Sequence, residues 1–177
     1  MDLLAGILPG IFGNHNDLSM VFIGRDDCLP DGTKVFEQIK SACSNYADRL
    51  HYHQALNKMK LYPFIEQAEA VLIPSRVDNC PNACLEAQMF GIPVIGTYDS
   101  SLDEMIEDGI TGFLARNSDP ESIRDAIERC LLLTFEEKKQ IRQNILSHVE
   151  LIDKEDRTGQ LLAFYEDTVK KFRGLHV

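Results

Sequence analysis

The chain has 177 residues, of which 44% are hydrophobic and 26% are charged, and these proportions fit one globular domain and argue against disorder. Its formal net charge is −10, which argues against nucleic acid or an anionic membrane surface as the main partner. No stretch approaches about 18 consecutive apolar residues. The first residues also lack the basic start of a signal peptide, so the sequence predicts no transmembrane segment.

The cysteines bear on redox chemistry and metal binding. There are five, and their spacing fits neither a zinc site nor a secreted disulfide framework, so reduced thiols in a cytosolic protein are expected. Cys80 and Cys84 stand four positions apart, but no histidine lies near them. We therefore predict no metal site.

The first part of the chain alternates between helical and strand patterns. Apolar residues at helical spacing predict a helix over residues 3–11, although Pro9 and Gly10 would bend or shorten it. A buried strand is predicted at residues 19–23, and a polar loop follows at residues 24–32. The next predicted elements are a helix over residues 35–46 and a strand over residues 49–53.

The same alternation continues until helices take over. The predicted elements are a helix at residues 61–68, a strand at 70–73, a helix at 81–90, a strand at 93–97, a short helix at 102–107 and a strand at 112–114. Asp119-Pro120-Glu121 then suits a helix start, and residues 134–137 form a capping box. Apolar spacing over residues 161–172 predicts a last amphipathic helix.

Short strands separated by helices predict a parallel sheet, because parallel strands need crossover connections and these are right-handed. The predicted fold class is therefore α/β, a Rossmann-like parallel sheet with helices on both faces. Such sheets bind ligands at the carboxyl ends of their strands. The loops that begin at Gly24 and at Pro74 would lie there.

Two carboxylates flank the helix start that follows the second of these loops. Asp78 lies in the loop, and Glu86 stands eight positions later, about one and a half turns inside a helix that begins near Pro81. A helix start attracts phosphate, whereas carboxylates accept hydrogen bonds from hydroxyl groups. A nucleotide-sugar, which carries phosphates between a ribose and a sugar, satisfies both requirements.

Two sequence blocks resemble a known family. The first contains Pro74-Ser75, Asp78, then after seven residues Glu86-Ala87, and later Gly91-Ile92-Pro93-Val94. The second is Glu-Met-Ile-Glu-Asp-Gly-Ile-Thr-Gly-Phe-Leu at residues 104–114. In this order, the chain resembles the carboxyl-terminal domain of a retaining GT-B glycosyltransferase of family 4, the glycosyl transferases group 1. The resemblance covers nearly the whole chain and implies one half of a GT-B fold.

The resemblance also implies roles for individual residues. Glu86 would bind the ribose hydroxyls, and Asp78, which stands where glutamate is commoner, would hold the transferred sugar. The strand end around residues 52–56 would meet the base, although Gln54 replaces a common glycine there. The implied donor contacts are Gly24, Gln54, Ala55, Asn79, Cys80, Pro81, Asn82 and Leu85.

Parts of the family pattern are not found in residues 1–177, which we expect to form a single nucleotide-sugar-binding domain. The family's first strand, its Gly-Arg and Lys-Gly basic residues and its amino-terminal acceptor domain would precede Met1. Arg25 and Arg76 are basic, but neither occupies the matching position. The chain is therefore expected to be inactive alone.

The function implied by the resemblance is transfer of a hexose, such as mannose or glucose, with retention from a UDP- or GDP-sugar. The acceptor would be a glycan or a lipid-linked sugar in envelope or polysaccharide assembly, bound by the absent half, and no metal or other cofactor is expected. The location would be the cytoplasm, with contact to the inner membrane face only through that half. The alternative is a non-catalytic nucleotide-sugar-binding or protein-interaction module with the same fold.

Overall fold

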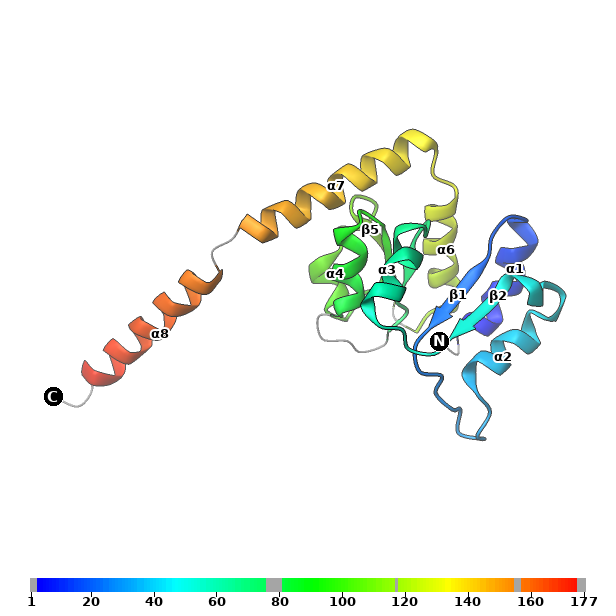
Figure 1. Ribbon diagram of the computed structural model, residues 1–177, viewed down its shortest axis with the longest axis horizontal. Helices are drawn as coiled ribbons and strands as arrows, with labels where there is room; N and C mark the ends of the chain where they lie inside the picture. The colour runs from blue at the N-terminus through cyan, green and yellow to red at the C-terminus, as the bar shows by residue number, and fades with distance from the viewer. Residues whose placement is uncertain (1–2, 76–80, 117, 155–156, 175–177) are drawn as a thin grey trace.

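The computed structural model describes residues 3–75, 81–116, 118–154 and 157–174, in which short parallel strands alternate with helices (Figure 1). The elements before the second loop are α1 (Leu4–Asn14), β1 (Met20–Ile23), α2 (Val35–Ala42), the 3-10 helix η1 (Ser44–Arg49), β2 (Leu50–His53), α3 (Lys58–Glu66) and β3 (Val71–Leu72). Those after it are α4 (Asn82–Met89), β4 (Val94–Thr97), α5 (Leu102–Met105), β5 (Gly112–Ala115), α6 (Pro120–Leu131), α7 (Phe135–Lys154) and α8 (Arg157–Gly174).

The order of the predicted helices and strands agrees with the prediction, whereas several helix boundaries differ by one to four residues. The helix predicted over residues 35–46 ends at Ala42, and the chain continues as the 3-10 helix η1. Helix α3 begins three residues before its predicted start, because the Asn57 side chain accepts a hydrogen bond from the Lys60 N–H at 3.2 Å and caps the helix.

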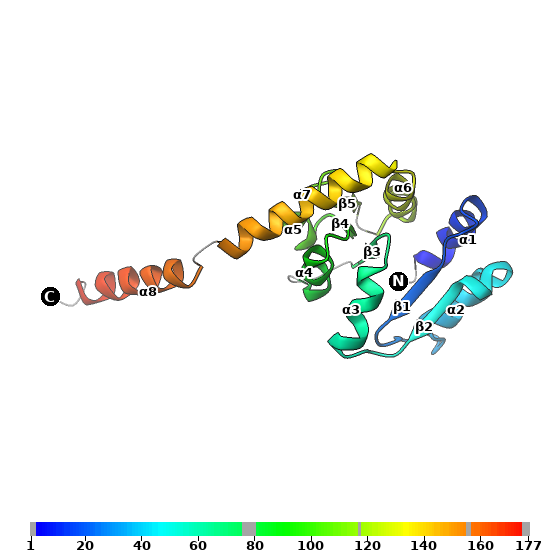
Figure 2. The ribbon, with the colours of Figure 1, turned by 45° about the horizontal axis from the view of Figure 1, so that its top comes forward.

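All strand pairs are parallel, as predicted, and they form two ladders. One ladder joins β1 to β2, and the other has the order β3-β4-β5. In the described chain, no ladder links β1 to β3, so each of these strands has one edge without a strand partner. Figure 2 shows the β1–β2 ladder, with α1 and α2, beside the β3–β5 ladder, with α4 to α7.

Helix α1 joins the two ladders. It contacts both α2 and α6, and its apolar side chains belong to one core with residues from both ladders. Phe22 and Leu50 enter this core from the first ladder, and Ile95 and Phe113 enter it from the second. The residues of α1 in this core are Leu4, Ile7, Leu8, Ile11 and Phe12.

The other face of the β3–β5 ladder carries a second core. Cys84 and Ala87 of α4 pack there with Val94 and Leu114. All residues of β4 and β5 are buried, so helices cover both faces of this ladder, as predicted. The β1–β2 ladder is more open: Val21 is 40% exposed, and α3 approaches its second face through Phe64, whose ring lies 5.4 Å from the His53 ring.

In the turn before β5, several residues of the second sequence block have a structural role. Arg129 of α6 donates two hydrogen bonds to the Asp108 carboxylate, at 2.9 and 3.1 Å, and the Leu114 N–H donates a third at 2.8 Å. Gly109 has φ +76°, and its N–H donates to the Gly112 carbonyl at 2.8 Å. This turn therefore attaches β5 to α6.

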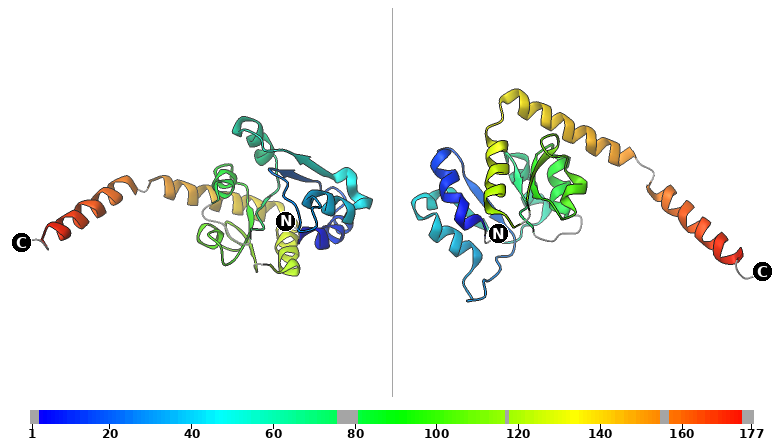
Figure 3. Two further views of the ribbon diagram at one scale, coloured as in Figure 1. Left: turned by 90° about the horizontal axis from the view of Figure 1, so that it is seen from below. Right: turned by 180° about the vertical axis from the view of Figure 1, so that it is seen from behind.

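Helix α8 extends away from the body of the molecule (Figure 3). It exposes an apolar series of side chains, although it contains charged residues as well. Within the described segments, no helix is both long and apolar enough to cross a bilayer. The exposed apolar residues of α8 are Leu161, Leu162, Phe164, Tyr165, Val169 and Phe172.

Gly112→Ala should lower the free energy of unfolding by about 1–3 kcal/mol, as overpacked core variants do. A Cβ at Gly112 would overlap the Val94 carbonyl oxygen and would lie 2.9 Å from Ile106 Cγ2. Gly6→Ala is the control, because nothing lies within 4 Å of its added Cβ in α1 and Ala favours a helix by about 1 kcal/mol. Urea unfolding measures both variants, and equal effects would contradict this packing account.

Asp108→Asn should destabilise the fold at pH 7 but have progressively less effect in acid. Burial raises the Asp108 pKa, but hydrogen bonds from Arg129 and Leu114 outweigh burial and lower the pKa below its ordinary 3.8. Stability from a lowered carboxyl pKa is complete above that ordinary value and is lost as the pH falls through the folded-state value.

Urea midpoints of wild type and Asp108→Asn should therefore converge below about pH 4. Asp103→Asn, on the exposed surface of α5, serves as the control and should show no comparable pH-dependent difference. A constant difference between Asp108→Asn and wild type at all pH values would contradict the role of the Asp108 charge.

Candidate functional site

The carboxyl ends of β1 and β2 bring together Gly24 and the segment that was predicted to meet a base. The Gly24 N–H donates to the His53 carbonyl at 3.1 Å, and the Tyr52 hydroxyl donates to the Gly24 carbonyl at 2.9 Å. Gly24 has φ +141°, a conformation that side chains disfavour. Gln54 and Ala55 follow His53 directly, so these three predicted donor contacts lie at one sheet edge.

A cavity of about 460 Å³ opens beside Gly24. Phe22 and Tyr52 line it from the two strands, and Phe36 lines it from α2. Arg25 is also at its rim, but this side chain is highly exposed and pairs with Asp27 at 2.9 Å. Arg25 is thus already paired with an acidic neighbour.

Helix α4 begins at the carboxyl edge of the second ladder, as the sequence predicted. Pro81 is the N-cap and Asn82 is the first helical residue, so the helix starts one position after the predicted Pro81. Pro81 offers no side-chain hydrogen bond to cap this end. The first-turn N–H groups and the helix dipole therefore favour an anion there.

Glu86 lies on α4 and is the one buried residue among the acidic, basic and histidine side chains of the described segments. Its side chain is 11% exposed, and Glu86 Oε1 lies 3.0 Å from Lys58 Nζ on α3. Lys58 is not among the site residues predicted from the sequence. Its only local signal is its position directly after the Asn57 cap and four residues after Gln54.

The loops after β3 and β4 are tied together at the same edge. The buried Thr97 hydroxyl donates to the Ser75 carbonyl at 2.5 Å, and the Ser100 hydroxyl donates to the Thr97 carbonyl at 2.8 Å. The segment after Ser75 leads to the predicted sugar-binding loop. Arg76, Asp78, Asn79 and Cys80 lie outside the described residues, so their predicted roles remain predictions.

The described cysteines offer little chemistry at neutral pH. Cys43, Cys84 and Cys130 are buried thiols outside any disulfide, and Cys28 is an exposed thiol. Burial raises the Cys130 pKa to about 11, which keeps this thiol protonated and poorly nucleophilic. Across the described ranges, no three histidine, cysteine, aspartate or glutamate side chains gather as a possible metal site.

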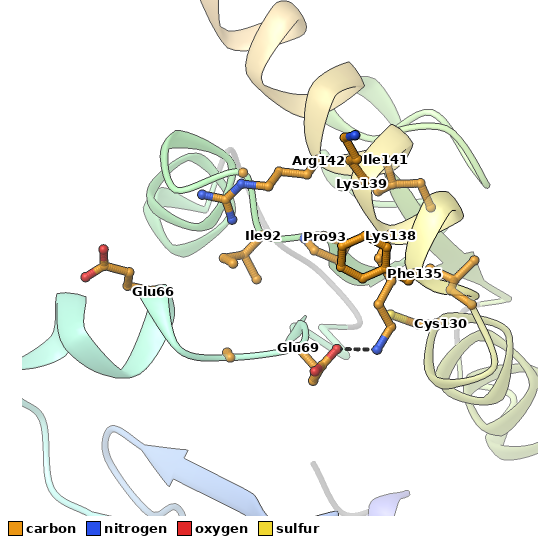
Figure 4. Close-up of a pocket in the computed structure, with 13 residues that line it drawn as sticks. Glu66, Glu69, Ile92, Pro93, Cys130, Phe135, Lys138, Lys139, Ile141 and Arg142 are labelled. Carbon is orange, nitrogen blue, oxygen red and sulfur yellow. Dashed lines mark hydrogen bonds and ion pairs between the residues drawn. The ribbon is translucent and has the colours of Figure 1, made fainter.

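A second cavity, of about 510 Å³, lies at the opposite edge of the sheet (Figure 4). Pro93 lines it just before β4, and Glu69 lines it just before β3, so it adjoins the amino ends of these strands. Lys138 of α7 also lines this cavity, and its Nζ lies 2.6 Å from Glu69 Oε2. This cavity is therefore separate from the edge that carries Gly24 and Glu86.

The family of this chain follows from comparison with known protein families. Residues 3–148 match the family model described as glycosyl transferases group 1. The chain belongs to this family. The match includes both ladders, Glu86 and Lys58.

Relatives similar in sequence are longer than this chain. A glycogen synthase of Pseudomonas syringae pv. tomato is 26% identical over 153 residues, which cover 86% of this chain and 28% of that enzyme. An uncharacterized 41.2 kDa protein in the cps region of Klebsiella pneumoniae is 27% identical over 114 residues, covering 64% of this chain and 30% of that protein. The chain thus spans less than a third of the length of these relatives.

Comparison with solved structures confirms the fold. HepE of Anabaena in complex with UDP has a TM-score of 0.74 and 16% identity, covering 91% of this chain and 44% of HepE. The C-terminal domain of LpcC from Francisella tularensis has a TM-score of 0.69 and 18% identity, covering 84% of this chain and 75% of that domain. The Rossmann-like α/β fold with parallel strands is thereby confirmed.

Thr97→Val should lower the free energy of unfolding by about 1 kcal/mol, the net value of one hydrogen bond, because it removes the donor to Ser75. Thr168→Val is the matched control, since its exposed hydroxyl donates to the Phe164 carbonyl within α8. The control should stay within about 0.5 kcal/mol of wild type in urea unfolding. Equal losses in both variants would argue against a special role for the Thr97 bond.

Proposed function

We propose that this chain is the donor-binding domain of a hexosyltransferase. The donor is a UDP- or GDP-sugar, the transferred group is a hexose such as glucose or mannose, and the acceptor is a glycan or a lipid-linked sugar. Transfer proceeds with retention of configuration. The observation that carries this proposal is the buried carboxylate of Glu86 on α4, at the carboxyl edge of a group 1 fold.

The parts of the site suit different parts of the donor. The Glu86 carboxylate accepts hydrogen bonds from the ribose hydroxyls, and the first turn of α4 meets the diphosphate. Gly24 and the segment at Gln54 and Ala55 approach the base. Asp78 positions the transferred sugar, as the family resemblance implies.

Solved structures with the same fold support the choice of donor. HepE has been solved in complexes with UDP and with UDP-glucose, and these structures share the fold of this chain. At identities of 16–18%, these structures share the fold with this chain and do not select the base, so uracil and guanine are the two bases to compare.

Catalysis requires a second, acceptor-binding domain, and residues 1–177 act as the donor half. The coverage of only 44% of HepE supports this division. The free edges of β1 and β3 support the further proposal that the family's first strand belongs between them. The enzyme works in the cytoplasm, with any contact to the inner membrane face made through the acceptor half.

Glu86→Gln should weaken binding of the nucleoside diphosphate that wild type binds by about 10–100-fold. The reason is that a hydrogen bond to a charged group contributes about 1.5–3 kcal/mol. Calorimetric titration of the chain with UDP, GDP and UDP-glucose gives the affinities. Glu136→Gln on the exposed surface of α7 is the control and should bind as wild type does.

The titration separates three outcomes. Absence of binding by wild type to all three nucleotides would overturn the proposed function. Binding that Glu86→Gln leaves unchanged would overturn the assignment of Glu86. Nucleotide binding without transfer by the full-length protein would favour the alternative, a non-catalytic nucleotide-sugar-binding module.

A further inference from the structure

Helices α3 and α4 meet through two matched pairs of side chains. Lys58 and Tyr62 stand one turn apart on α3, and Glu86 and Phe90 stand one turn apart on α4. Lys58 Nζ lies 3.0 Å from Glu86 Oε1, and the Tyr62 and Phe90 ring centroids lie 5.3 Å apart in an edge contact. The aromatic pair fixes the two helices side by side and thereby places the ammonium group at the carboxylate.

The position of Lys58 is unfavourable for the helix that carries it. Lys58 is the first residue of α3, where the helix dipole is positive and disfavours a cation. Its interaction with Glu86 opposes this effect: the hydrogen bond to Glu86 and the attraction of its charge raise the Lys58 pKa above 10.5. Lys58 therefore stays charged at neutral pH.

The two partners differ in exposure, and this difference matters for a ligand. The Glu86 side chain is largely buried, whereas 69% of the Lys58 side chain is exposed. Lys58 binds Glu86 Oε1, and no hydrogen bond or ion pair occupies Oε2 within the described residues. Within the described residues, the protein thus contacts one oxygen of the carboxylate and leaves the other for an incoming donor.

Lys58 also connects two parts of the site that belong to different ladders. It follows Gln54 and Ala55, at the end of β2, by a few residues, whereas Glu86 belongs to α4 and the second ladder. In a chain of net charge −10, the ammonium group also offsets the repulsion that Glu86 would exert on a diphosphate.

We propose that Lys58 is a positioning residue of the donor site, which holds Glu86 Oε1 so that Oε2 faces the ribose hydroxyls of a nucleoside diphosphate. This inference rests on the proposed function. Lys58 acts through Glu86. Its effect on affinity therefore depends on the ligand hydroxyl groups from which Glu86 accepts hydrogen bonds.

Calorimetric titration with a nucleoside diphosphate and its 2′,3′-dideoxy analogue tests this inference, using whichever of UDP and GDP wild type binds. Lys58→Met should weaken the natural nucleotide about tenfold, the effect of one ordinary hydrogen bond, and leave affinity for the dideoxy analogue unchanged. Lys58→Arg should restore affinity to within about threefold of wild type, since Arg keeps the charge. Lys60→Met, on the same helix, is the matched control and should resemble wild type.

The double variant Lys58→Met/Glu86→Gln should bind no more weakly than Glu86→Gln alone, because the two residues act as a unit. Equal losses for the natural nucleotide and the dideoxy analogue would overturn the inference and assign Lys58 to phosphate binding or to the fold. An unchanged affinity of Lys58→Met for the natural nucleotide would also overturn the inference, because the Lys58–Glu86 contact would then be a surface ion pair without a role in binding.

Failure of this inference is distinguishable from failure of the proposed function. If wild type binds the nucleotide and Glu86→Gln weakens it while Lys58→Met does not, only the role of Lys58 is lost. If wild type binds neither UDP nor GDP, both are lost. Urea midpoints of each variant show that the affinities compare folded proteins.

Discussion

The close pairing of β4 with β5 is the constraint on which the rest of the structure depends. Both strands are buried on both faces, and Gly112 lets β5 approach the Val94 backbone more closely than any side chain would allow. The Asp108–Arg129 contact then fixes α6 against β5. Because α4 leads into β4 by a parallel crossover, its first turn must lie at the carboxyl edge of the ladder. The location of Glu86 is thus a consequence of strand pairing.

A carboxylate in that location carries an electrostatic cost. Glu86 is flanked on α4 by Cys84 and Ala87, which belong to an apolar core, and removing a charge from water is unfavourable unless it is paired. The partner comes from outside α4, through the exposed Lys58 of α3. Arg25 is less suited to that role because Asp27 already neutralises it. The local charge balance therefore depends on the contact between α3 and α4.

The elements of the fold were predictable because their signals are local. Residues 93–97 carry β-branched and proline signals, and β4 occupies residues 94–97 of that range. The 3-10 helix η1 was not predictable, because spacing alone does not separate it from the end of α2. The division into two ladders was also not predictable, since strand pairing is a property of distant segments.

The candidate site was predictable in part for the same reason. Glu86 was selected because it belongs to a family motif, and the structure places it in a buried position on α4. Lys58 was missed because an exposed lysine beside a helix cap has no distinctive local pattern, and its partner lies far along the chain. Asp78 belongs to the family motif as well, but it lies outside the described residues.

Helix α1 gives the site an unexpected dependence on the core. Gly24 and Gln54 belong to one ladder and Glu86 belongs to the other, and no strand pairing joins these ladders within the described chain. The distance between the two ladders is set by α1, which packs between α2 and α6, and by α3, which connects β2 to β3. The two ends of a bound nucleotide would therefore rest on bodies that are held in alignment by an apolar helix. Nucleotide affinity in such a molecule reports on the alignment of its two ladders as well as on the residues that touch the ligand.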